Sequence, residues 1–261
     1  MWTIGAWAAL ALSGVIGLSL GLVGGGGSII TVPVLVYVAG LSAREGVALS
    51  LPIVGVTALV GAVAQWRDGN VHGRAALIFS LTGMLGAVGG ARLTPLVPPP
   101  VLMTLFAALM IAVGARMARG GDEEKMPRRV ECNPLKCGAT GLGLGVLTGF
   151  LGVGGGFLLV PALLSFARLP MRQAVGTSLL IIAANSLAGF LAHRGEVQGH
   201  LPLAAAFTGA AVAGMVVGLR LSHRVPPGGL KKLFGALALG VAVFLLAMNF
   251  RPLLELVSHS R

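Results

Sequence analysis

Residues 21–33 read GLVGGGGSIITVP, and residues 149–161 read GFLGVGGGFLLVP. Each stretch lies inside a long apolar block and places a run of glycines before a valine-proline pair. A glycine weakens a helix by roughly 1 kcal/mol relative to alanine, so such a run is expected to break a helix. The two stretches lie 128 residues apart (149 − 21), which indicates that one unit is present twice.

The composition is that of an integral membrane protein, because 56% of the residues are hydrophobic and only 10% are charged. Eight blocks contain no Lys, Arg, Asp or Glu: residues 1–43, 46–66, 75–91, 93–115, 137–167, 173–192, 201–219 and 233–250. A helix crosses the hydrocarbon with about 20 residues, so six blocks match one span each, and the two that contain the glycine runs are longer. The blocks lack the alternation of barrel strands. We therefore predict an all-α polytopic membrane bundle.

The 128-residue register holds without a gap from Gly24 against Gly152 to Pro99 against Pro227. We divide the chain into a first membrane repeat at residues 1–118, a polar connector at 119–136, a second membrane repeat at 137–250 and a polar tail at 251–261. The tract Gly24 to Gly27 and the tract Gly152 to Gly156 thus occupy matching places in two homologous repeats.

Loop charge bears on whether the repeats are parallel or inverted. If each broken block crosses the membrane once, the 19 bases divide 11 to 8 between the two sides. If each broken block returns to its starting side, 14 bases lie on one side, and the other five are Arg44, Arg92, Arg194, Arg251 and Arg261. The second division favours inverted repeats, with a cytoplasmic connector and both termini external.

Helices broken at matching places in two repeats indicate a transporter's binding site. We expect helices to resume at Ser28 and at Phe157, where free N–H groups and the positive helix end suit an anion. The alternative is that the glycines only allow close helix packing. Hydroxyl and amide groups within the spans would complete the site. The substrate-binding candidates are Gly24, Gly25, Gly26, Gly27, Ser28, Ser50, Thr57, Gly152, Gly154, Gly155, Gly156, Gly176, Thr177, Ser178 and Asn185.

Polar residues at the span ends are candidates for a gate or vestibule, although a solvated loop would contain the same residue types. They are Gln65, Asp68, His72, His193, Glu196 and His200. No carboxylate lies in a span interior, and no nucleophile or metal-ligand cluster is visible, so we predict no enzyme, no metal and no cofactor. The net charge is +11, and the basic residues lie almost wholly between the apolar blocks. This placement favours contact with lipid headgroups over contact with nucleic acid.

The two glycine-proline stretches, together with AVGTSL at residues 174–179, resemble the TauE/SafE sulfite exporter family. The resemblance runs from Gly14 to about Phe250 and implies a permease of the cytoplasmic membrane for sulfite, sulfonates or other small organosulfur anions, with export as the expected direction. In the first repeat the Gly176-Thr177-Ser178 motif is replaced by Ala48-Leu49-Ser50, which predicts an asymmetric site. The alternatives are an anion channel, which differs in showing no saturation or counter-transport, and a membrane-embedded enzyme or scaffold.

Overall fold

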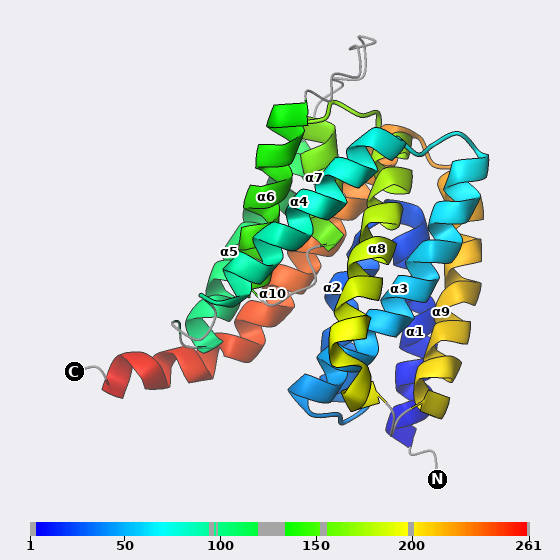
Figure 1. The fold of residues 1–261 in the computed structure, drawn as a ribbon. Coiled ribbons are helices and arrows are strands. Elements are labelled where there is room, and N and C mark those ends of the chain that lie inside the picture. The colour runs from blue at the N-terminus through cyan, green and yellow to red at the C-terminus, as the bar shows by residue number, and fades with distance from the viewer. Residues whose placement is uncertain are drawn as a thin grey trace.

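The computed structural model describes residues 4–93, 97, 99–119, 134–151, 156–197 and 201–259, and these form helices and turns without any strand (Figure 1). The helices of the first half are α1 Ile4–Val23, α2 Gly26–Pro33, the π-helix η1 Val34–Val38, α3 Ala43–Arg67, α4 Gly73–Ala91 and α5 Pro99–Arg119. Those of the second half are α6 Pro134–Leu151, α7 Gly156–Ser165, α8 Met171–Val197, α9 Leu201–Ser222 and α10 Pro227–His259. The all-α prediction is confirmed for this part of the chain.

Five helices are long and apolar enough to cross a membrane, and they lie within α3, α4, α8, α9 and α10. Shorter apolar helices occur at Leu10–Val23 and Gly156–Ser165. The exposed side chains of the five long helices include many large apolar residues, such as Leu77, Leu85 and Val88 on α4. Backbone groups of a helix are satisfied internally, so these apolar faces can lie against lipid.

The first glycine tract turns the chain back on itself. Helix α1 ends at Val23, and Gly24 then takes a φ of +75°, in the left-handed region that suits glycine. Helix α2 packs closely against α1: a Cβ atom at Gly27 would lie 2.5 Å from the Ile16 carbonyl oxygen and 2.6 Å from Leu20 Cγ. The predicted restart at Ser28 is wrong by two residues: α2 begins at Gly26, since only Gly24 and Gly25 leave the helical conformation. Likewise α7 begins at Gly156, one residue before Phe157.

The two longest central helices, α3 and α8, cross antiparallel through small residues. A Cβ atom at Gly61 would lie 3.1 Å from Leu179 Cδ1, and one at Gly189 would lie 3.0 Å from Leu51 Cδ2. The shift of 128 relates Leu51 to Leu179 and Gly61 to Gly189, so the same contact is made twice (51 + 128 = 179; 61 + 128 = 189). Between these two points, Gly55 of α3 lies against Ser186 of α8.

Glycines also bring α1 against α9 and α6 against α4, with each pair running parallel. In the first pair, Gly17 and Gly21 lie against the backbone of Ala211 and Met215. In the second pair, Gly145 and Gly149 lie against the backbone of Gly83 and Ala87. No room is left for a Cβ atom at these glycines, so the close-packing interpretation holds for them.

Three pairs of matching helices begin 128 residues apart in the two halves. The starts are 43 and 171 for α3 and α8, 73 and 201 for α4 and α9, and 99 and 227 for α5 and α10. In Figure 1, α3 and α9 run upward while α4, α8 and α10 run downward. The first helix, α1, begins near the lower edge of the view, and the last helix, α10, ends there. Helix α10 continues to His259 and so includes most of the predicted tail.

Candidate functional site

The turn between α1 and α2 meets the beginning of α7 inside the bundle. A Cβ atom at Gly25 would lie 2.5 Å from the Gly156 carbonyl oxygen and 3.1 Å from Phe157 Cα. Phe157 is buried and stacks edge-to-face on Phe106 of α5, with ring centroids 5.3 Å apart. The beginning of α2 and the beginning of α7 are therefore in contact, and both are buried in the bundle.

In the part of the chain that the structure describes, the N-cap residue of α2 makes no side-chain capping bond. Gly25 occupies the N-cap position and has no side chain to accept from the first-turn N–H groups. Gly26 and Gly27 are buried in that first turn, and a Cβ atom at Gly26 would lie 2.7 Å from Leu237 Cδ2 of α10. The N-terminus of α2 is thus buried and carries the positive end of the helix dipole, and the flexible tip of Leu237 is its neighbour.

Ser178 of α8 binds the α1–α2 turn directly. Its hydroxyl lies 2.8 Å from the Gly24 carbonyl oxygen and 2.8 Å from the Val175 carbonyl oxygen, to either of which it can donate. Ser178 is fully buried. Because Gly24 belongs to the first half of the chain and Ser178 to the second, this bond joins the two halves at the glycine break.

The motif Gly176-Thr177-Ser178 contacts two turns: its first two residues meet the turn between α3 and α4, and Ser178 meets the turn between α1 and α2. Gly176 allows the Asn70 carbonyl oxygen to approach, and a Cβ atom there would also lie 3.0 Å from Gln65 Cβ. The Thr177 hydroxyl oxygen accepts from the His72 N–H at 3.0 Å. Together with the Ser178 bond, these contacts give each residue of the motif a structural partner outside its own helix.

Two predicted binding hydroxyls are engaged locally. The Thr57 hydroxyl donates to the Ile53 carbonyl oxygen at 2.6 Å, and the Ser50 hydroxyl donates to the Val47 carbonyl oxygen at 2.7 Å. Such bonds to the preceding helical turn are common for hydroxyl side chains in helices. Their oxygens keep lone pairs, but their protons are used, which makes them weak candidates as donors to an anion.

Among the described residues, Gln173 Oε1 and Asn185 Oδ1 of α8 are buried without a hydrogen-bond partner, and of the two only Asn185 is a predicted binding residue. Seven residues, about two helical turns, separate it from Ser178, so both lie on nearly the same face of α8. Buried polar atoms are usually paired, and each exception needs an explanation. Oδ1 can only accept, so an anion at this place would bind the Nδ2 group of the same amide.

The predicted gate residues that can be placed lie at turns. Gln65 is buried and accepts from Asn70 Nδ2 at 2.9 Å, while His72 Nδ1 accepts from the Ala75 N–H and so caps α4. The Asp68 carboxylate lies 3.4 Å from His223 Nε2. The side chains of Ser28, His193 and Glu196 lie outside the described part of the chain, as do Gly152, Gly154, Gly155 and His200 entirely.

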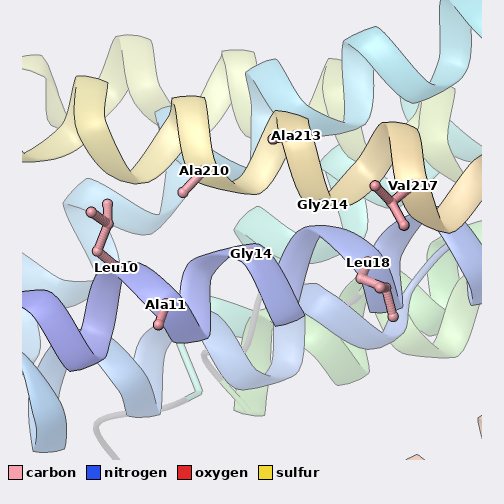
Figure 2. A pocket seen from close by; sticks show the side chains of 8 residues that line it. All are labelled: Leu10, Ala11, Gly14, Leu18, Ala210, Ala213, Gly214 and Val217. Atoms are coloured by element: carbon pink, nitrogen blue, oxygen red, sulfur yellow. The ribbon is translucent and has the colours of Figure 1, made fainter.

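Two surface grooves are apolar and contain none of the predicted binding residues. The first, of about 540 Å³, lies between α1 and α9 and is lined by residues such as Leu10, Gly14 and Gly214 (Figure 2). The second, of about 240 Å³, lies beside Leu59 and Leu180. Their composition suits lipid chains rather than an anion.

Comparison with known proteins agrees with the helical membrane architecture. The family described as Sulfite exporter TauE/SafE matches residues 9–245. The chain belongs to this family. A probable membrane transporter protein of Xylella fastidiosa (strain Temecula1) is 32% identical over 246 residues, covering 92% of this chain and 94% of the relative. The probable membrane transporter protein YdhB of Bacillus subtilis (strain 168) is 24% identical, covering 81% and 88%. No solved structure matches.

Sequence reasoning missed three features of this TauE/SafE family member. Asn70 and His223 were not selected, because they act through contacts between turns that are distant in sequence and carry no local signal. The contact of Gly25 with Gly156 also has no signature. The close-packing glycines do have a sequence signature. Gly17 and Gly21 are spaced four residues apart, and so are Gly145 and Gly149.

Proposed function

We propose that this chain is a carrier that moves small anions, such as sulfite, sulfonates or related organosulfur compounds, out of the cell across the cytoplasmic membrane. The family supports transport, and one observation carries the choice of an anion. The N-terminus of α2, whose N-cap residue Gly25 makes no side-chain capping bond, lies buried against the beginning of α7. A buried helix N-terminus of this kind favours negative charge.

The proposed site lies between this glycine break and the face of α8 that carries Ser178 and Asn185. Ser178 fixes the turn through the Gly24 carbonyl oxygen, and Asn185 carries an amide whose Nδ2 group can donate to an anion. Neutral groups hold an anion without a fixed counter-charge, which lets the anion leave again. Export of an anion from a negative-inside cell is favourable by roughly 2.3 kcal/mol per charge per 100 mV, which supports release toward the far side.

The two halves are proposed to be inverted repeats. Support comes from the antiparallel crossing of α3 and α8, whose contacts Gly61 to Leu179 and Gly189 to Leu51 are related by the 128-residue shift. The hairpin of α1 and α2 brings the first broken block back to its starting side. This is the arrangement in which 14 of the 19 bases fall on the connector side, which supports a cytoplasmic connector and external termini.

Flux measurements in proteoliposomes test this function. Purified protein is reconstituted, and uptake of labelled sulfite, sulfate, thiosulfate and short sulfonates is compared with that of protein-free liposomes. A carrier gives saturable uptake of at least one anion that is accelerated when the same anion is loaded inside. Uptake that rises linearly with concentration and shows no acceleration favours the channel, and no uptake of any anion contradicts the proposal.

A further inference from the structure

The turn between α3 and α4, residues 68–72, is bound to the beginning of α8 by directional polar contacts. The His72 N–H donates to the Thr177 hydroxyl oxygen at 3.0 Å, and Thr177 is fully buried. This bond spans 105 residues of sequence. It holds a turn at the membrane surface against a helix that passes the proposed anion site.

Three further contacts hold the same turn in place. Asn70 donates through Nδ2 to Gln65 Oε1 at 2.9 Å and through its backbone N–H to the Gln65 carbonyl oxygen at 2.9 Å. Gln65 is 3% exposed, so this amide pair is largely removed from water. The Asn70 carbonyl oxygen then rests on Gly176, where any side chain would collide with it.

The turn between α9 and α10 adds a link at the same end of the bundle. His223 Nε2 lies 3.4 Å from Asp68 Oδ2, and Arg172 Nη2 of α8 donates to the His223 carbonyl oxygen at 3.3 Å. The Asp68 and His223 side chains are about half exposed, so this pair contributes less than the buried bonds. It nevertheless joins α3, α8 and α9 where all three meet the connector side.

At the opposite end of the same helix crossing, α3 carries different residues at the two positions of α8 that hold this turn. The positions that correspond to Gly176 and Thr177 are Ala48 and Leu49 (176 − 128 = 48; 177 − 128 = 49). Leucine has no acceptor for a backbone N–H, and the Cβ atom of alanine reduces the space that Gly176 leaves open. The two ends of the α3–α8 crossing therefore differ in chemistry although their helices match.

We propose that Gln65, Asn70, His72 and Thr177 form the closed gate of the connector side, and that Thr177 is the residue that holds it shut. This inference rests on the proposed carrier function. In a carrier built from matched halves, the two ends open in alternation around a central site. The polar lock at one end makes the connector-closed state the resting state, and an anion enters from that side only after the Thr177 bond breaks.

Cysteine labelling tests the gate without any substrate. Cys132 and Cys137 are replaced by serine, and Ile181→Cys is introduced as a reporter, because Ile181 is fully buried one turn further into the bundle than Thr177. A membrane-impermeant thiol reagent is applied to each side in turn. The Thr177→Val variant, which keeps the shape and loses the acceptor, is expected to raise the labelling rate from the connector side about three- to tenfold.

The matched variant Thr177→Ser keeps the hydroxyl and should label at the rate of the parent protein. Should Thr177→Val fold poorly, a second variant is available. Asn70→Ala removes the side-chain hydrogen bond from Asn70 to Gln65 within the same turn, and it should raise the labelling rate from the connector side. Equal rates in the valine and serine variants, or a rise from the opposite side, overturn the gate. Because labelling needs no anion, a failed flux assay would refute the transport function without deciding the gate.

Discussion

Replacing Gly24 by alanine tests the close approach at the first glycine break. Gly24 has a φ of +75°, and a left-handed conformation costs an alanine about 1–2 kcal/mol. In addition, the new Cβ atom would lie 2.7 Å from Ser178 Oγ and 2.8 Å from Val175 Cα, and the second of these is backbone that cannot rotate away. Overpacking of this kind costs typically 1–3 kcal/mol, so the total loss of stability is about 2–5 kcal/mol.

Gly40 provides the matched control for this change. Its φ is +74°, but a Cβ atom added there would have nothing within 4 Å. Gly40→Ala therefore carries the backbone cost alone, about 1–2 kcal/mol. Unfolding of both purified variants in detergent, followed by heat or denaturant, measures the difference. Equal losses of stability in Gly24→Ala and Gly40→Ala would refute the close contact between the α1–α2 turn and α8.

Two further pairs of substitutions separate packing from function. Gly145→Ala should destabilise the protein by more than 1 kcal/mol, because the Cβ atom would collide with the backbone of α4, whereas Gly143→Ala meets nothing within 4 Å and should be neutral or stabilising in the same unfolding assay. Gly26→Leu, and Gly155→Leu in the second tract, should insert into the membrane at normal levels but abolish anion uptake, because the side chain would fill the break; wild-type uptake in both would remove the glycine tracts from the site.

The helical architecture and the place of the glycine break could be predicted from sequence because both depend on local properties. Block length and the low helix propensity of glycine are enough to expect a helix that ends near Gly24. The shift of 128 likewise anticipated that α3 and α8 begin at matching residues. The restart of α2 at Gly26 was missed because glycine can take helical angles once the turn is complete.

The candidate site was harder to predict, because contacts between distant segments decide which of its polar groups already have hydrogen-bond partners. Thr57 and Asn185 occupy corresponding positions in the two halves, yet Thr57 donates within its own helix while Asn185 Oδ1 has no partner. The sequence made them equal candidates. Thr177, expected to bind an anion, instead accepts from the His72 N–H, 105 residues away.

The most direct test of an anion site beside α8 is the uptake of the preferred labelled anion by Asn185→Leu proteoliposomes. A buried polar atom without a partner costs about 1–3 kcal/mol, so the apolar side chain should raise the unfolding midpoint. If Asn185 binds the anion, uptake should fall at least tenfold, since a hydrogen bond to a charged group contributes roughly 1.5–3 kcal/mol. The neighbouring Ser186→Ala variant, on the α3-facing side next to Gly55, should keep wild-type uptake. Wild-type uptake by Asn185→Leu would contradict the account.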